Sequence, residues 1–536
     1  MTFRKITVFL LVLCLLSGLD GCGMKQADEN TSSLWVVTEA SCSDGMNLQA
    51  EIIAERMEKD NPGLTVELDI LPTDPQEREI TLKQLRTKIM SGNGPDVFLL
   101  PTGNTLTTDY TNEHLHRLTR NTEIEPLFLD VNQAMRSGQF LDLTTFYDGD
   151  PAVDTAALKR EIMDAGTVGN RRYVLPLRFN IPVICTDPKL WDNYGISREK
   201  LTSGGPELVW TLLEWAGSAP ICAGVQLPAD LTLLSDAFDY EQEQLLLSPK
   251  TLADYMRLYQ RWRSAAIPGE QMLLQAALTE TMSYVEDPMW KSILEEPNRD
   301  LFRTIRSYNT LSNYVSEDIH WSTKGFPLFS CSMADSLESL AVAKTYESIY
   351  GEKRELFYFP WRDSGGAVTA NVTYWGAVGS GTIEPELSYG FLRQFLDEEF
   401  QWDTYRPKQN DSGKRPQAEV QCAGQVENSW PVSASGSAAA LWETLRYQNR
   451  KMAFSGRKES HQIGAAARAL SFRDSDIPAL SWDIDEVRFP VTISGTDSLE
   501  YALSQLNEPD GTPTDADIDA LAQQVYQGLW WHLAEG

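Results

Sequence analysis

The stretch Met90-Ser-Gly-Asn-Gly-Pro-Asp-Val-Phe-Leu-Leu100 places a helix end, a tight turn and a buried strand next to one another. Its Gly and Pro residues interrupt the helical pattern before them and mark a turn. The continuous apolar run from Val97 to Leu100 is typical of a parallel strand that is covered on both faces. This stretch therefore predicts the last strand of an α/β unit that begins upstream.

The residues upstream supply the rest of that unit. Leu34 to Thr38 is a short apolar strand, and Leu64 to Ile70 alternates apolar and polar residues with the period of a strand. Apolar residues at helical spacing predict a helix over Asn47–Asp60. A second helix is expected over 75–91, with Asp74 as its N-cap and a proline in its first turn. The order βαβαβ predicts an α/β fold with a doubly wound sheet.

Sheets of this kind bind ligands beyond the carboxyl ends of their strands. Glu39 follows the first strand, and Thr102 and Asn104 follow the third, so these three are candidate ligand contacts. A dinucleotide-binding fold would need Gly-x-Gly-x-x-Gly after the first strand, and this chain has Thr-Glu-Ala-Ser-Cys-Ser-Asp-Gly over 38–45. A nicotinamide-dependent dehydrogenase is therefore excluded.

The N-terminal residues indicate export. Arg4 and Lys5 precede the apolar run Ile6–Leu16, which has about half of the ~20 residues that span a bilayer and is typical of a signal peptide. Leu19-Asp20-Gly21-Cys22 resembles the lipobox of bacterial lipoproteins, in which Cys22 is diacylated, although Asp20 departs from that pattern. A plain secretory peptide is the alternative. We expect a signal peptide over 1–21 and a polar, lipid-anchored tether over 22–33.

Composition excludes several classes of site. The 536 residues are too many for one core and predict at least two domains. A net charge of −30 weighs against nucleic-acid binding, which needs a basic face. Besides Cys14 and Cys22, five scattered cysteines remain, and five histidines show no ligand spacing, so we expect no disulfide framework, no metal and no cofactor.

The rest of the chain alternates extended and helical patterns. We expect extended segments over 173–177, 182–185, 357–360 and 372–378; helices over much of 191–350 and over 387–400, 437–453 and 515–533; and a long loop over 403–429.

Several of these stretches together resemble the extracellular solute-binding proteins of ABC importers, most closely the branch that binds carbohydrates. The resemblance rests on Met90–Leu100, Tyr173-Val-Leu-Pro-Leu177, Asp187-Pro-Lys-Leu-Trp-Asp-Asn-Tyr-Gly195, Trp210-Thr-Leu-Leu-Glu-Trp215, Glu384–Gln401, Trp430-Pro-Val432 and Gln524–Glu535. It touches both ends and the middle of the mature chain. The Asn-Gly-Pro-Asp turn is its most specific part.

The resemblance implies two α/β lobes, each a doubly wound sheet flanked by helices, that are joined by crossing strands and close around a solute. It also implies that the protein is not an enzyme, acts as a monomer on the outer face of the cytoplasmic membrane and delivers a carbohydrate or oligosaccharide to ABC permease subunits. The expected parts are 34–178 (lobe 1, first part), 179–357 (lobe 2, first part), 358–404 (lobe 1, second part) and 405–536 (mainly lobe 2).

The resemblance further implies ligand contacts. Arg178 and Asn180 lie in the first expected crossing and point to the same face of a strand, either to a solute or as charged and polar hinge residues. Trp361 and one of Tyr374 and Trp375 are candidate stacking platforms, because adjacent strand residues point to opposite faces. The alternative for these rings is core packing. Asp335 lies where the family often has a cleft turn, although its local sequence departs from that turn.

Other functions stay open. The same fold could bind a peptide or another small solute, or act as a sensor. Ser197-Arg-Glu-Lys200 fits Ser-x-x-Lys, but the companion motifs of penicillin-recognising enzymes are absent from the sequence, and the stretch is better read as a capped helix start. A secreted glycoside hydrolase needs only two suitably spaced carboxylates, which sequence cannot select from 76 acidic residues.

The lipid anchor can be tested at one atom. Cys22→Ser removes the sulfur that would carry the diacylglycerol, so the protein should move from the membrane fraction to the soluble exported fraction. Fractionation of cells that express each form measures this. An unchanged membrane fraction would show that the protein is not held by Cys22.

Overall fold

The computed structural model describes residues 32–39, 46–102, 105–108, 121–181, 183–186, 238–254, 256–257, 357–360, 367–397, 430–433, 483–491, 497–506 and 513–535, with a few single positions between them. Among these residues, no helix combines the length and the apolar content needed to cross a bilayer. The signal peptide, residues 22–31 of the expected tether, the 403–429 loop and the 437–453 helix lie outside them. The predicted end of the tether at residue 33 was wrong, because Ser32 and Ser33 already pair in the first strand of the sheet.

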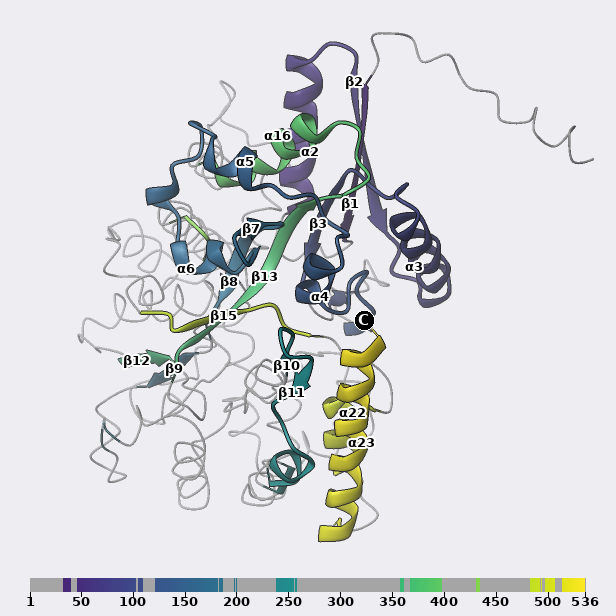
Figure 1. The fold of residues 1–536 in the computed structure, drawn as a ribbon, viewed down its shortest axis with the longest axis vertical. Helices are drawn as coiled ribbons and strands as arrows, with labels where there is room; N and C mark the ends of the chain where they lie inside the picture. The colour runs from purple at the N-terminus through teal and green to yellow at the C-terminus, as the bar shows by residue number, and fades with distance from the viewer. Residues whose placement is uncertain are drawn as a thin grey trace, which may run out of the picture.

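A seven-stranded mixed sheet organises most of the described chain (Figure 1). Its strands are β1 (Ser32–Glu39), β2 (Leu64–Leu71), β3 (Val97–Pro101), β8 (Val174–Asn180), β13 (Thr369–Val378), β14 (Trp430–Pro431) and β15 (Glu486–Arg488). The order is β14-β8-β13-β3-β1-β2, with β15 also paired to β13. β1 is parallel to β2 and β3, whereas β13 is antiparallel to β3 and β8. The α/β class is therefore confirmed.

The connections of β1, β2 and β3 follow local sequence signals. Helix α3 (Pro75–Met90) starts with the side chain of Asp74 accepting from two backbone N–H groups and with proline in its first turn. It stops before Gly92, which has a φ of +74° that few other residues adopt. The carboxylate of Asp96 accepts from the backbone N–H of Trp35 at 2.9 Å and from the hydroxyl of Thr382 at 2.7 Å. Asp96 is thus the structural residue that joins this turn to the strands.

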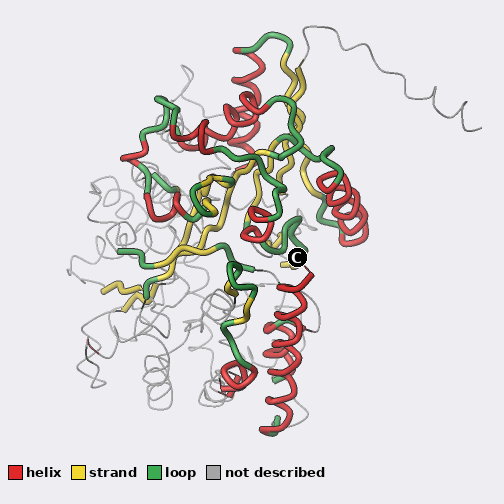
Figure 2. Tube along the Cα trace, in the orientation of Figure 1, coloured by secondary structure: helices red, strands yellow, loops and turns green. Residues whose placement is uncertain are grey.

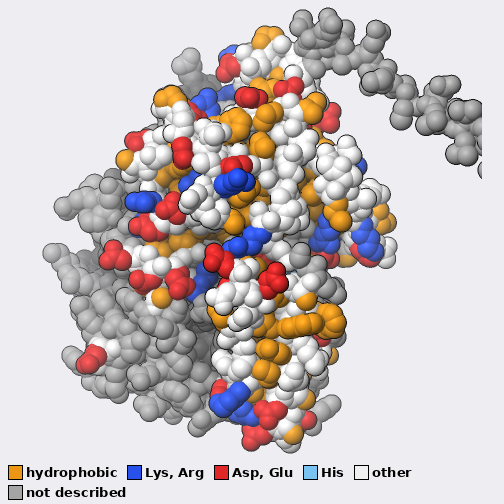
Figure 3. Space-filling model, viewed as in Figure 1, with side chains coloured by type: hydrophobic (Ala, Val, Ile, Leu, Met, Phe, Trp, Pro, Cys, Tyr) orange, Lys and Arg blue, Asp and Glu red, His pale blue; other side chains and the backbone are white. Residues whose placement is uncertain are grey.

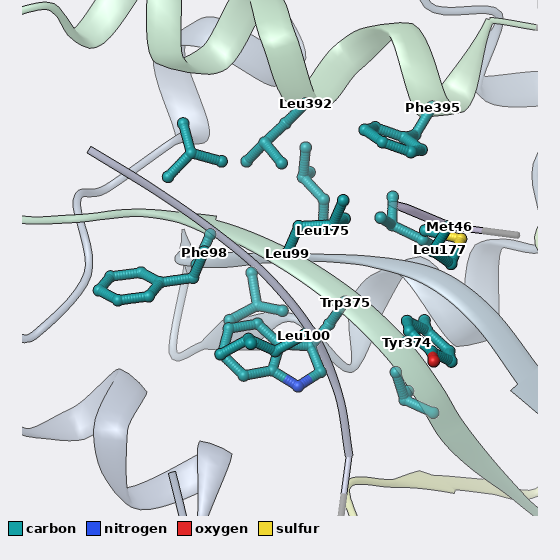
Figure 4. Close-up of a cluster of buried hydrophobic side chains, with 14 of the residues drawn as sticks. Met46, Phe98, Leu99, Leu100, Leu175, Leu177, Tyr374, Trp375, Leu392 and Phe395 are labelled. Atoms are coloured by element: carbon teal, nitrogen blue, oxygen red, sulfur yellow. The ribbon is translucent and has the colours of Figure 1, made fainter. Parts of the chain in front are cut away.

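Helices cover both faces of the sheet. Right-handed crossovers place α2 (Met46–Asp60) and α3 on opposite faces (Figure 1). Helix α16 (Pro385–Arg393) lies on the face of α2, where Leu392 packs with Leu99 and Leu175 (Figure 4). On the opposite face, Phe98 and Trp375 pack towards the segment that contains α4 (Val131–Arg136). We call the buried apolar residues of these layers the first core.

A second set of buried apolar residues, the second core, lies below the sheet (Figures 1 and 2). It joins α22 (Leu499–Gln505), α23 (Asp515–Glu535), the short strand β10 (Phe238–Asp239) and the side chains of Leu252, Ala253 and Met256. The chain passes between the two cores near β15, because Phe489 is buried in the first and Val491 in the second. Two packed units are therefore present, whereas the proposed lobe boundaries stay predictions.

The other described elements are short. They are β4 (Thr105–Thr108) with β5 (Asn121–Ile124), α5 (Thr144–Asp148), η1 (Thr155–Ala157), α6 (Arg160–Asp164), β6 (Thr167–Val168) with β7 (Arg171–Arg172), β9 (Val183–Thr186) with β12 (Phe357–Pro360), β11 (Gln244–Leu245) and η3 (Gln394–Leu396).

Two predicted boundaries were wrong. The helix expected to reach Phe400 ends at Arg393, because a 3₁₀ turn follows and Asp397 is extended. The strand expected to start at Val372 begins at Thr369, since its polar first residues pair with β8 and β15. The remaining strand and helix predictions that fall on described residues agree with the structure to within a few residues.

Close packing of the turn around Asp96 depends on Gly379, where a Cβ would lie 2.2 Å from the carbonyl oxygen of Pro95. Gly379→Ala should lower the free energy of unfolding by about 1–3 kcal/mol, because backbone must shift. At Gly390, inside α16, a Cβ would meet nothing within 4 Å, so Gly390→Ala should raise it by about 0.5–1 kcal/mol. Denaturant unfolding of both variants measures the difference. Equal stability of both would contradict this packing.

Candidate functional site

The carboxyl ends of β1 and β3 lie at the same edge of the sheet as the first half of β13. β1 and β3 are parallel, and β13 runs antiparallel to β3. The backbone N–H of Thr102, just past β3, donates to the carbonyl of Thr373 on β13 at 2.9 Å. This edge is the one at which open α/β sheets bind ligands, and the strand β15 that leads to the second core is paired beside it.

Buried polar side-chain atoms gather at this edge. Among the described residues, five side-chain oxygens there are buried and have no hydrogen-bond partner, and we call their residues the polar row: Thr38, Thr102, Thr369, Asn371 and Thr373. Leaving one such group unpaired costs about 1–3 kcal/mol, and native proteins leave few of them. The row therefore marks a place where the protein keeps hydrogen-bonding capacity at the expense of stability.

Asn371 is the most constrained member of the polar row. Its side chain is 2% exposed, and its Nδ2 donates to Oδ1 of Asn180 at 3.4 Å. The two residues are direct partners across β8 and β13. Because that bond fixes which end of the amide faces Asn180, the carbonyl oxygen of Asn371 is left as a buried acceptor.

The structure brings four predicted site residues to this edge. Thr102 belongs to the polar row, and Asn180 holds Asn371. Tyr374 is paired across the sheet with Arg178, whose side chain is 2% exposed. Their contact with a solute stays a prediction, but they lie on neighbouring strands, as one site requires.

Trp375 lies in the first core. It is 1% exposed, and its ring centroid is 5.7 Å from that of Phe128 and 5.5 Å from that of Phe140. Tyr374, 6% exposed, lies on the opposite side of β13 (Figure 4). The two rings thus lie on opposite faces of β13, as predicted. Tyr374 pairs with Pro101, the last residue of β3, so it lies one residue nearer to the polar edge than Trp375 does. A stacking role for either ring stays a prediction.

Glu39 is held in a buried ion pair at the end of β1. Its two carboxylate oxygens accept from Arg78 on α3 at 2.9 and 2.6 Å, and both side chains are 3% exposed. Arg78 also donates to the backbone carbonyls of Pro72 and Glu125. This bidentate arrangement holds β1, α3 and the backbone at Glu125 together. A solute contact by Glu39 stays a prediction.

Three other predicted contacts, Asn104, Asp335 and Trp361, lie outside the described residues, as does Cys22. Sequence reasoning missed four members of the polar row: Thr38 on β1, and Thr369, Asn371 and Thr373 on β13. A signal was available for the three on β13, because they put a polar side chain at every second position of a segment that is otherwise apolar.

Uncharged groups make up the polar row, and Arg178 on β8 brings a cation to the same edge. In the part of the chain that the structure describes, no three His, Cys, Asp or Glu side chains are placed to hold a metal ion. On the face drawn in Figure 3, acidic and basic side chains are interspersed over the described residues. The polar row itself consists of hydroxyl and amide groups.

Solved structures with a similar arrangement include extracellular solute-binding protein family 1 from Alicyclobacillus acidocaldarius, 12% identical with a TM-score of 0.42. They also include a periplasmic oligogalacturonide-binding protein from Yersinia enterocolitica, 12% identical with a TM-score of 0.43, and a de novo designed cysteine esterase, 13% identical with a TM-score of 0.45. Each match covers 94% of this chain and 99% of the other. No protein-family model and no curated protein matches the sequence. We carry no residue role or ligand over from these structures.

The buried ion pair gives a test of the site's scaffold. Arg78→Ala leaves the carboxylate of Glu39 buried without its cation, so the free energy of unfolding should fall by about 3–5 kcal/mol. Lys83→Ala, on the same helix, removes an exposed pair with Glu79 and should cost about 0–0.5 kcal/mol. Urea unfolding of both variants measures this. Equal losses would show that the Glu39–Arg78 pair does not hold the end of β1.

Proposed function

We propose that the protein captures a carbohydrate or oligosaccharide at the polar row, without chemistry on it, and delivers it to the permease of an ABC importer. The observation that supports this most is the set of buried, unpaired hydroxyl and amide oxygens at the carboxyl edge of the sheet. A polyhydroxylated solute offers donors and acceptors at close spacing, and Thr hydroxyls can both donate and accept. Binding would return to these groups the hydrogen bonds that burial removed.

The position of the site supports a binding role. The polar row lies on the sheet of the first core, and β15 beside it continues through Phe489 to Val491 in the second core. A solute held at this edge can therefore be enclosed by motion of the second core relative to the first. The signal peptide would direct export, and the lipidated Cys22 with the tether that follows it would hold a monomer at the outer face of the membrane, where the permease subunits lie.

Two variants remove hydrogen-bonding groups of the polar row and should leave the fold intact. Thr373→Val and Thr369→Val remove buried hydroxyls that have no partner among the described residues, so each should leave the melting temperature without solute unchanged or higher. Thr87→Val is the matched control, because its hydroxyl is exposed on α3 and bonds to Lys83. We expect wild-type affinity of about micromolar, and a loss of about 10- to 100-fold in the two site variants only.

The measurements are native mass spectrometry of the purified protein, a thermal-shift screen of oligosaccharides and titration calorimetry of the best solute. The solute should raise the melting temperature by mass action. A co-purified peptide, or site variants that bind as tightly as the control, would contradict a carbohydrate site at the polar row. Release of cleaved sugar in proportion to protein would show a glycoside hydrolase instead.

A further inference from the structure

Asp130 is a buried carboxylate at the boundary of the two cores. It precedes α4, and its Oδ1 accepts from the backbone N–H of Gln133 at 3.1 Å, which caps the helix. Its side chain is 1% exposed. The helix that follows is anchored in the first core by Val131, Ala134 and Met135. Asp130 is therefore a fixed part of the first core.

The other oxygen of this carboxylate is bonded from the second core. The hydroxyl of Tyr240, next to β10, donates to Oδ2 of Asp130, and Nε2 of His532 on α23 lies 3.2 Å from the same oxygen. The ring of Phe238, buried in the second core, packs on both aromatic partners at centroid distances of 5.6 Å. The guanidinium of Arg136 lies 5.5 Å from the centre of the Tyr240 ring.

The two cores are thus attached in two ways. One attachment is covalent: the chain passes between residues of the two cores from Ile181 to Phe238, from Met256 to Val368 and from Phe489 to Val491. The other is the group of side chains around Asp130. Chain connections of this kind leave a hinge rotation between two packed units possible, whereas a side-chain contact outside them fixes one angle. The Asp130 group can part by breaking hydrogen bonds alone, so it can hold or release that angle.

We propose that Asp130, Tyr240 and His532 form a latch that holds the second core against the first. The carboxylate accepts two donors where water is excluded, and such charge-assisted bonds are about twice as strong as neutral ones. Burial, with the nearby Asp130 charge, raises the pKa of Tyr240, so its hydroxyl stays protonated and donates. Opening the latch exposes a carboxylate that must be hydrated. A half-open contact, in which the carboxylate is neither bonded nor hydrated, is unfavourable, so the contact is either fully made or fully open. The latch acts whether or not a solute binds.

The test follows hydrogen exchange of backbone amides in the full-length protein without added solute. Asp130→Asn keeps an oxygen to cap α4 but loses the charge, and Tyr240→Phe loses only the hydroxyl. We expect each to speed exchange in α22 and α23 at least tenfold, while β1 and α2 stay at wild-type rates. Asp142→Asn is the matched control, because Asp142 accepts from the backbone N–H of Thr144 at the start of α5, beside the first core, and should leave α23 unchanged.

The double variant separates a latch from two unrelated losses. Because both single variants break the same bond, Asp130→Asn with Tyr240→Phe should speed exchange by less than the product of their separate factors. Wild-type exchange in α23 of both single variants would overturn the proposal. So would an equal rise in β1 and α2, because that would show a general loss of stability and not a release of the second core.

Discussion

Strand β13 is hydrogen-bonded along both of its edges, to β8 on one side and to β3 and β15 on the other. This constraint joins segments that are hundreds of residues apart in the chain and places the two halves of β13 in different surroundings. Its second half, from Trp375 to Val378, is buried between helices on both faces. Its first half runs past the end of β3 and carries three residues of the polar row, Thr369, Asn371 and Thr373. The register shifts around Thr373 and Tyr374 mark the change between the two.

The polar row and the apolar half of β13 depend on each other energetically. Unpaired buried oxygens can be kept only where other interactions exceed their cost. The aromatic rings around Trp375 and the bidentate pair of Glu39 with Arg78 lie next to the row and supply such stabilisation. A binding edge held in this way needs little rearrangement when a polar solute arrives, so less affinity is lost to ordering.

The sequence predicted the elements that short-range patterns determine. The continuous apolar run of β3, the alternation in β2 and the cap at Asp74 each lie within a few residues, and the structure agrees with them. Partners from distant segments could not be predicted in the same way. Glu39 was correctly placed at the rim, but its bond to Arg78 crosses 39 residues, and the bond of Asn371 to Asn180 crosses 191. Hydrophobic periodicity contains no information about such pairs, since only the packed sheet brings them together.

Two buried carboxylates with different partners show how this chain distinguishes permanent from separable contacts. Glu39 is held inside one core by a guanidinium that donates twice, so parting them would leave two buried charges unpaired. Asp130, between the two cores, is bonded by a phenol and an imidazole, which are both uncharged when the imidazole is neutral. When the two cores separate, the phenol and the imidazole regain hydrogen bonds from water. A guanidinium parted from Glu39 would stay buried and unpaired, which costs more free energy. The partner of each carboxylate thus matches its place: an ion pair where the structure must not open, and hydrogen bonds to groups that can be neutral where one core meets the other.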